Sequence, residues 1–205
     1  MFAKRIKSLI ELKAPSIVLQ AEKCMLIDCI VLYKTNAVGE FLVNKKMKVI
    51  FLDVDGVLNT PSSESRCGEY IGIDDDKTKL LADIVKRMNA EIVLVSTWKK
   101  YWRKEEKLKP LQDYSATYLD EKLKKFGIKA TDKIKDKSDG KYLSRGEGIL
   151  EYIVRNKVEK YVILDDFQFD YDGCGLTGCF IKTKQAEGLT KEQSERACKI
   201  LSEQL

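Results

Sequence analysis

The chain has 205 residues, of which 44% are hydrophobic and 34% are charged, and its formal net charge is +5. This length supports one sizeable hydrophobic core, and the mild basic surplus permits an anionic partner without requiring nucleic acid. The sequence contains no histidine, which excludes Ser-His-Asp catalysis, Cys-His catalysis and histidine-ligated metals. Any chemistry must therefore use carboxylates, hydroxyls, thiols or amines.

Cysteine usage and hydropathy indicate where the protein works. No apolar run is long enough for a membrane span, and the basic start MFAKRIKSLIELK lacks the apolar segment of a secretory signal. None of the six cysteines forms a Cys-x-x-Cys pair. We therefore expect reduced thiols and a cytoplasmic protein.

Residues 1–46 differ in pattern from the rest of the chain. They hold two apolar-rich stretches, FAKRIKSLIEL and SIVLQAEKCMLIDCIVLY, and no motif of known chemistry. We expect both stretches to be helical, although MLIDCIVLY fits a strand equally well. The predicted organisation is a helical extension of unknown function over residues 1–46 and a main domain over residues 47–205.

Strands alternate with helices after Lys48, which predicts βαβ units around a parallel sheet. The expected strands are KVIFL, EIVLVS, FGIKA, YVILDD and CFIKT, and the expected helices cover residues 77–88, 116–125, 144–155 and a closing segment from Thr190. The pairs Ser144 with Glu147 and Thr190 with Gln193 predict capping boxes at two helix starts.

Two acids, Asp53 and Asp55, follow the apolar run of the first predicted strand. Ligand sites in parallel sheets lie just beyond the carboxyl ends of the strands. An Asp-x-Asp-Gly turn can also arise because the carboxylates shape the loop by hydrogen bonding. The pair alone therefore leaves a structural and a functional interpretation open.

Polar side chains also follow two other predicted strands. Ser96 and Thr97 follow the second, whereas Asp165 and Asp166 end the fourth. Hydroxyls in this position often cap the next helix, and paired acids in a loop are often solvated. All four lie where parallel strands end at one edge of the sheet, so a shared site is the simpler explanation.

Several carboxylates at one edge need a cation. Two unit charges 4 Å apart repel by about 4 kcal/mol at an effective dielectric of 20. Oxygen ligands with room for water and phosphate favour Mg²⁺ over zinc. A calcium EF-hand is excluded because Val57 and Leu58 occupy its fifth and sixth positions. An Asp-x-Asp nucleotide-sugar site of a glycosyltransferase stays possible, but it gives Ser96 no role.

The motifs DVDGVLN, VLVST, an arginine near a helix start and VILDD resemble, in order and spacing, the four signature motifs of haloacid dehalogenase-like (HAD) phosphatases. The series is most similar to the small branch found in Swiss Army knife RNA repair proteins, and the resemblance covers about residues 47–205. It implies a Rossmann-like three-layer α/β/α fold with a central parallel sheet. It also implies Mg²⁺-dependent hydrolysis of a phosphate monoester.

In this resemblance, Asp53 is the nucleophile that forms an aspartyl-phosphate, and Asp55 is the general acid and base. Ser96, or alternatively Thr97, donates to a phosphoryl oxygen. The cation of the third motif is Arg145, with Lys141 in reserve.

The resemblance also implies a metal site. Mg²⁺ would bind Asp53, the backbone carbonyl of Asp55, and either Asp165 or Asp166. Asp170 would assist through water. The competing interpretation from another class is a catalytically silent module that binds phosphate or RNA.

Only residues 60–76 separate the first motif from the next predicted helix, so we expect a nearly capless domain with an open site. An open site admits a small phosphate ester or a nucleic-acid end, as in RNA or DNA repair. The segment KKYWRKEEKLK, residues 99–109, combines basic and aromatic residues as single-strand binding surfaces do. Its candidate backbone contacts are Lys99, Lys100, Arg103 and Lys104. The alternative is a solvated helix whose tryptophan packs inward.

Overall fold

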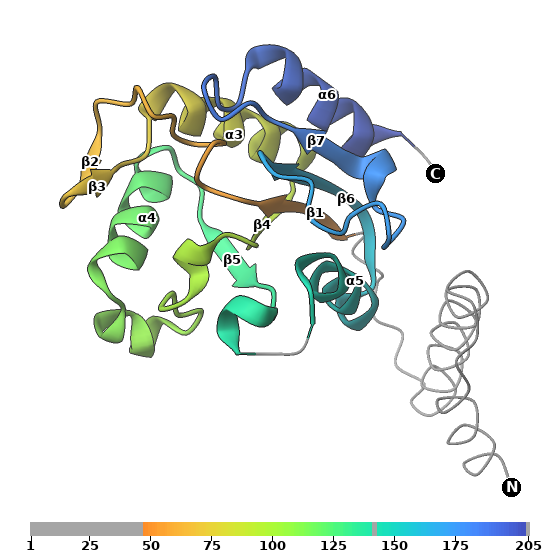
Figure 1. Cartoon of the computed structure of the whole chain (residues 1–205), viewed down its shortest axis with the longest axis horizontal. Coiled ribbons are helices and arrows are strands. Elements are labelled where there is room, and N and C mark those ends of the chain that lie inside the picture. Colours follow the sequence, from red (N-terminus) through yellow and green to blue (C-terminus); the bar gives the residue numbers. More distant parts are fainter. Residues whose placement is uncertain (1–46, 141–142, 204–205) are drawn as a thin grey trace, which may run out of the picture. The chain divides into compact units, whose positions relative to one another are not determined.

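The structure is a computed structural model that describes residues 47–140 and 143–203. Its centre is a five-stranded sheet in the order β5-β4-β1-β6-β7, and all neighbouring strands in it are parallel (Figure 1). The strands are β1 (Met47–Leu52), β4 (Glu91–Leu94), β5 (Ala130–Lys133), β6 (Val158–Asp165) and β7 (Phe180–Lys182). The expected parallel α/β architecture is confirmed.

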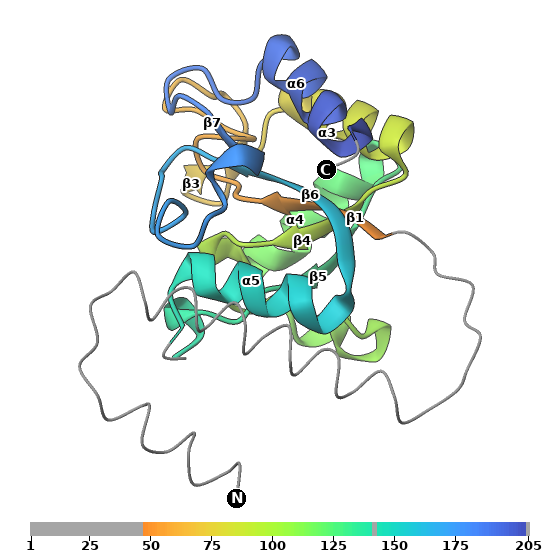
Figure 2. The same cartoon turned by 90° about the vertical axis from the view of Figure 1, so that its right-hand side faces the viewer.

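Helices cover both faces of the sheet. They are α3 (Asp75–Met88), α4 (Tyr114–Lys125), α5 (Arg145–Asn156) and α6 (Lys191–Ser202). Figure 2 shows α3 and α6 on one side of the sheet and α5 on the other. The domain is therefore the three-layer α/β/α arrangement that the sequence predicts.

Strand β1 lies in the middle of the sheet and is apolar on both faces. Ile50 and Leu52 pack into the core beside α3, α4 and α6, whereas Val49 and Phe51 pack toward α5. Successive residues of a strand point to opposite faces, so a strand covered on both sides needs this uninterrupted apolar run. The run fixes where β1 ends, and so where Asp53 begins the loop.

The third predicted strand is displaced. FGIKA was expected to be the strand, but Phe126 caps α4 and β5 starts only at Ala130. Gly127 has φ of +70°, a conformation that ends a helix and that glycine adopts without strain. The strand formed is the more polar ATDK, which lies at the edge of the sheet.

The connection between β1 and α3 holds a small antiparallel hairpin, β2 (Arg66–Cys67) and β3 (Tyr70–Ile71). Figure 1 shows it beside α4. No separate folded cap lies between β1 and α3 in this described stretch, in keeping with the expected open site.

Both predicted capping boxes are confirmed, at Ser144 with Glu147 and at Thr190 with Gln193. In the described part of the chain, Cys67, Cys179 and Cys198 are free thiols. Among the described helices, none has the length and apolar character that a bilayer crossing requires. The expected helical extension, residues 1–46, lies outside the described residues.

Candidate active site

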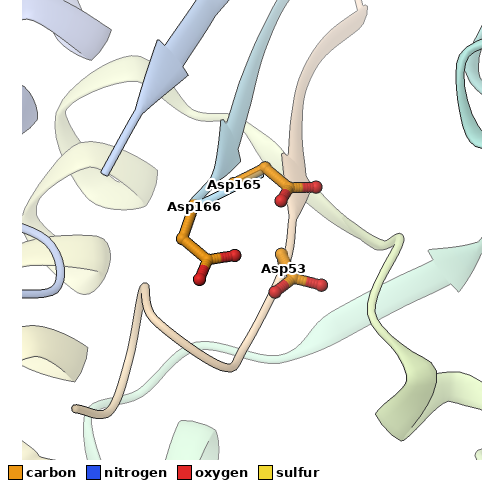
Figure 3. A group of neighbouring side chains, drawn as sticks. All are labelled: Asp53, Asp165 and Asp166. Carbon is orange, nitrogen blue, oxygen red and sulfur yellow. The ribbon is translucent and has the colours of Figure 1, made fainter. Parts of the chain in front are cut away.

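Three of the predicted carboxylates meet at the carboxyl edge of the sheet. One oxygen each from Asp53, Asp165 and Asp166 lies within 4.8 Å of the others, at the ends of β1 and β6 (Figure 3). The backbone fixes this arrangement because the Asp53 N–H donates to the carbonyl of Leu164 at 2.9 Å. Asp165 is fully buried and Asp53 nearly so.

This concentration of negative charge changes the ionisation of the acids. Burial and the neighbouring Asp165 raise the pKa of Asp53 to about 8. Burial and Asp165 also raise the pKa of Asp166 above its ordinary value. Full ionisation of the cluster is therefore unfavourable without additional positive charge, which is the electrostatic condition of a cation site.

Arg145 supplies part of the missing positive charge from the first turn of α5. Its Nη1 donates to Asp53 Oδ1 at 3.1 Å and to Asp165 Oδ2 at 2.8 Å. Burial acts to lower the pKa of Arg145, but the facing carboxylates outweigh burial and raise it. The ring of Phe169 lies 3.9 Å below the guanidinium carbon. The structure therefore brings Arg145 into contact with two carboxylates of the cluster, and its role as the phosphate-binding cation stays a prediction.

The two acids at the end of β6 have different surroundings. Asp165 Oδ2 also accepts from the Tyr171 hydroxyl at 2.7 Å, and its Oδ1 accepts from the Phe167 N–H at 2.9 Å. Asp166 is only half-buried and packs against Gly56, where a Cβ would lie 2.4 Å from Asp166 Oδ2. Gly56 also has φ of +70°, so the close approach and the turn both require glycine.

Asp55 lies beside this cluster and is exposed. Its two oxygens accept from different segments: Oδ1 from Asn59 Nδ2 at 2.9 Å, and Oδ2 from Trp98 Nε1 at 3.0 Å. Asn59 Oδ1 in turn accepts from the Gly56 N–H at 3.0 Å. These bonds hold the carboxylate of Asp55 in one orientation at the mouth of the site.

The hydroxyl pair follows β4 as expected. Residues Leu52 and Leu94 are register partners, so the chain after each strand leaves the sheet side by side. Ser96 is buried, and its Oγ accepts from the Trp98 N–H at 3.4 Å, whereas Thr97 is exposed. Lys141, the reserve cation, lies outside the described residues.

Asp170 is not brought into the carboxylate cluster. Its side chain accepts from the Ser144 hydroxyl and, at 2.9 Å, from the Gly146 N–H at the start of α5. Burial acts to raise the pKa of Asp170, but these bonds outweigh it and lower the pKa. A negative group at a helix N-terminus is stabilising, so the structure shows Asp170 anchoring the helix that carries Arg145.

The basic segment after Ser96 only partly fits a binding surface. Lys99 was expected to contact nucleic acid, but its side chain is fully buried and its Nζ donates to Asp136 at 3.0 Å. Trp102 is also buried, with its Nε1 donating to Asp120 at 2.8 Å. The inward-facing tryptophan of the alternative interpretation is correct, although the segment forms short 3₁₀ turns, Thr97–Lys99 and Glu106–Leu111, instead of a long helix.

Lys100 and Arg103 remain exposed, and so does Lys104, whose Nζ pairs with Asp132 at 2.7 Å. These three can still face a partner. Lys99 cannot, because an ammonium group that is paired inside the protein is not available to a ligand.

Sequence reasoning missed several residues that shape the site. Asn59 and Trp98 hold Asp55, Tyr171 holds Asp165, and Thr183 Oγ1 donates to the Gly56 carbonyl at 2.7 Å. Asn59 is the last residue of the motif DVDGVLN and Trp98 directly follows VLVST, so the sequence could have indicated both residues. Tyr171 and Thr183 lie outside the motifs, and only the folded structure brings them to the site.

The fold and the site define a class: a Rossmann-like α/β domain with an acidic, arginine-bridged site at the carboxyl edge of its parallel sheet. Residues 49–194 match the family model described as the HAD domain in Swiss Army Knife RNA repair proteins. This match covers more than half of the chain, so the protein belongs to that family, which confirms the resemblance and places the chain among phosphatase-type hydrolases. No curated protein gave a significant match to the chain.

Proposed function

We propose that the protein is a phosphatase that hydrolyses a phosphate monoester through an aspartyl-phosphate on Asp53. The observation that carries this proposal is the placement of a second, exposed carboxylate, Asp55, beside the cluster of Asp53, Asp165 and Asp166. A module that only binds phosphate has no use for two acids in the first motif. Covalent catalysis needs one to attack and another to move the proton.

The chemistry divides between the two acids. An oxygen of Asp53 attacks phosphorus, the bond from phosphorus to the leaving oxygen breaks, and Asp55 gives that oxygen a proton. Water then attacks the aspartyl-phosphate while Asp55 takes a proton from it, which releases phosphate and restores both carboxyl groups. Ser96 and Arg145 are the groups proposed to bind the phosphoryl oxygens, with Thr97 as the alternative to Ser96.

The carboxylate cluster fits a hard divalent cation, since its donors are all oxygens and its negative charge exceeds that of Arg145. We propose that Asp53, Asp166 and the backbone carbonyl of Asp55 hold Mg²⁺. Asp165 is less suited to direct ligation because Arg145, Tyr171 and the Phe167 N–H already engage its oxygens. When bound, Mg²⁺ supplies positive charge to the phosphoryl group.

The substrate class proposed is a phosphorylated nucleic-acid end or a small phosphate ester. The family's description names RNA repair proteins, and the exposed Lys100 and Arg103 follow the loop that holds Ser96. Both side chains would bind a phosphate backbone leading into the site.

The experiment is turnover of a chromogenic phosphate ester by wild-type protein and by Asp53→Asn, each with Mg²⁺ and with excess chelator. The amide has the size of the carboxylate but cannot attack phosphorus, so we expect a loss of several orders of magnitude with an unchanged circular dichroism spectrum. Asp55→Asn should lose nearly as much.

Mg²⁺ should also raise the melting temperature of the wild-type protein, because binding only to the folded state stabilises it. Residual activity of Asp53→Asn above about a tenth of wild type would refute the covalent route, since loss of a nucleophile costs far more than tenfold. Full activity in chelator would refute the metal requirement.

A further inference from the structure

Asp55 forms part of the wall of a hollow next to the carboxylate cluster. The hollow has a volume of about 430 Å³, within the range of small-molecule pockets. Its walls come from four segments: the loop after β1, the β2–β3 hairpin, the turn after β4 and the start of α4. The lining residues are Asp55, Cys67, Tyr70, Ile71, Thr97, Trp98 and Ser115.

The walls of this hollow are largely apolar. Tyr70 is 78% exposed and Ile71 38% exposed, which is unusual for large apolar side chains placed at a site. Trp98 continues into a row of rings: its centroid lies 6.3 Å from that of Tyr118, which stacks on Tyr114 at 6.5 Å. Of these three rings, Trp98 lines the hollow and can offer its face or edge to a planar partner.

Charge is nearly absent from the hollow. Asp55 is the one charged group among its lining residues, since burial raises the pKa of the Cys67 thiol and keeps it protonated. A strongly ionic partner would therefore find little to pair with beyond Asp55. The hollow suits a neutral, planar group attached to a phosphate.

The hairpin that carries Tyr70 and Ile71 is held in place. The N–H of Ile73 donates to the Tyr118 hydroxyl at 3.1 Å, and the N–H of Gly72 donates to the Ser65 carbonyl at 2.8 Å. The Ser63 hydroxyl donates to Asp74 at 2.5 Å. These bonds fix the backbone on both sides of the hairpin that carries the two exposed side chains, so this part of the wall is preorganised for a ligand.

We propose that this hollow receives the leaving group of the substrate and selects one that contains a planar aromatic ring. The inference rests on the proposed function, because a general acid must lie within reach of the leaving oxygen, so the rest of the leaving group lies beside Asp55. A nucleobase and a phenyl ring share this chemistry. The ring stacks against Trp98 and Tyr70, and the phosphoryl group lies toward Asp53.

The test compares two pairs of esters whose leaving alcohols are alike except for the ring: benzyl phosphate with n-butyl phosphate, and adenosine 5′-monophosphate with ribose 5-phosphate. Stacking of a base on a protein ring contributes about 1–3 kcal/mol, equivalent to roughly 5- to 150-fold. We expect kcat/KM of the ring substrate to exceed that of its partner by at least about tenfold in one or both pairs. A preference in the nucleotide pair alone identifies the ring as a nucleobase.

Variants of the full-length protein locate the preference. Tyr70→Ala should bring the ratio of ring to non-ring kcat/KM close to one, and Tyr70→Phe should restore it because the ring returns. Leu111→Ala removes an apolar side chain that is 69% exposed but lies outside the hollow. This control should keep the wild-type ratio.

Three outcomes overturn the inference. If n-butyl phosphate and ribose 5-phosphate are hydrolysed and neither ring substrate is preferred, the hollow does not select a ring while the proposed function stands. If the preference survives Tyr70→Ala, the ring binds elsewhere. If no ester is hydrolysed with Mg²⁺ present, the proposed function falls and this inference falls with it.

Discussion

Single side chains set the orientation of the proposed acid and base. Asp55 is exposed, yet Asn59 and Trp98 each donate to one of its oxygens. A carboxylate on a loop would otherwise sample several rotamers, and proton transfer requires a defined geometry. Trp98 is therefore a positioning residue as well as a wall of the hollow.

Replacing Trp98 by phenylalanine tests this positioning. Trp98→Phe keeps a ring but removes the donor to Asp55, so we expect kcat to fall by about 10- to 100-fold, the range seen when a supporting hydrogen bond is lost, with little change in KM. Trp102→Phe is the matched control because its indole donates to Asp120. The measurement is kcat and KM of wild type and both variants over a range of pH. A raised KM at unchanged kcat and pH profile would leave Trp98 with only a packing role.

A buried ion pair connects the two segments that lead from Ser96 and toward Arg145. Lys99 Nζ donates to Asp136, which also accepts from the Ser138 hydroxyl at 2.6 Å and its N–H at 2.9 Å. Burial acts to raise the pKa of Asp136, but the bonds from Ser138 and Lys99 outweigh burial and lower it. Lys99 and Asp136 thus join the segment after β4 to the one that leads toward α5.

Asp136→Asn should lower the free energy of unfolding at pH 7 by about 3–5 kcal/mol, because it leaves a buried ammonium group without its carboxylate. Because the folded pKa lies below 3.8, the wild-type advantage is complete above that pH and is lost as pH falls through the folded pKa. Denaturant unfolding of wild type and Asp136→Asn at several pH values measures the difference in free energy and its pH dependence.

Glu187→Gln, which alters the exposed pair of Lys184 and Glu187, is the control for Asp136→Asn. It should change stability by less than about 1 kcal/mol. If the difference in free energy of unfolding between wild type and Asp136→Asn stayed constant down to pH 2.5, Asp136 would not be ionised in the folded protein.

Among the elements, the β2–β3 hairpin depends on one glycine. A Cβ on Gly72 would lie 2.5 Å from the Tyr118 hydroxyl and 2.7 Å from the backbone nitrogen of Arg66. The second contact is backbone, so the hairpin itself must shift. Its two short strands add little to the core, which lies between the five-stranded sheet and the helices on its two faces.

Gly72→Ala should therefore loosen the hairpin while the domain stays folded. Amide hydrogen exchange should increase by at least about tenfold at Gly72 and Ile73, whose N–H groups bond the hairpin and Tyr118, with no change in β1 or β6. Gly178→Ala is the control, because nothing lies within 4 Å of its added Cβ. Unchanged protection at Ile73 would show that the hairpin tolerates the methyl group.

Sequence patterns predicted the elements that carry strong periodicity. The acids after β1 and β6 were located because apolar runs end sharply there, and the capping boxes have a fixed spacing. The hairpin was missed because strands of two residues have no period to detect. β5 was misplaced because FGIKA is more apolar than the edge strand ATDK, and edge strands need less apolar surface.

The surroundings of single site residues were harder to predict. Lysine is almost never fully buried unless it is paired, and the partner of Lys99 lies in a distant segment. For the same reason Asp170 looked like a metal ligand: nothing in the sequence shows that the start of α5 would bind it. Such contacts are set by tertiary packing, which local patterns do not report.

For the whole molecule, the excess of basic charge bears on the substrate. Each phosphate that a basic side chain neutralises releases counterions, so affinity for a single-stranded oligonucleotide falls with salt at a log-log slope of roughly −0.7 per contact. Lys100 and Arg103 are exposed, and the proposed function assigns such contacts to them. A small ester would show little salt dependence.

Charge reversal at Lys100 and Arg103 to Glu should raise KM for a phosphorylated oligonucleotide and flatten its salt dependence. Turnover of a small ester should stay nearly unchanged, because neither side chain touches the phosphoryl group. Arg196→Glu with Lys199→Glu makes the same change in net charge on α6 and should have little effect. Unaltered oligonucleotide kinetics in the first variant would remove nucleic acid from the proposal.

The bond from Thr183 to the Gly56 carbonyl joins residues 127 positions apart, and it bears on how the protein is made. On the ribosome, β1 emerges before β6 and β7, yet its central place in the sheet requires β6 as a neighbour. More than a hundred residues must therefore be synthesised after β1 before β6 is available. Until then the apolar strand β1 is exposed or bound by a chaperone. Thr183 must be synthesised before its bond can hold the loop that carries Asp53 and Asp55, so a shortened nascent chain contains the motif without the bond that fixes its geometry.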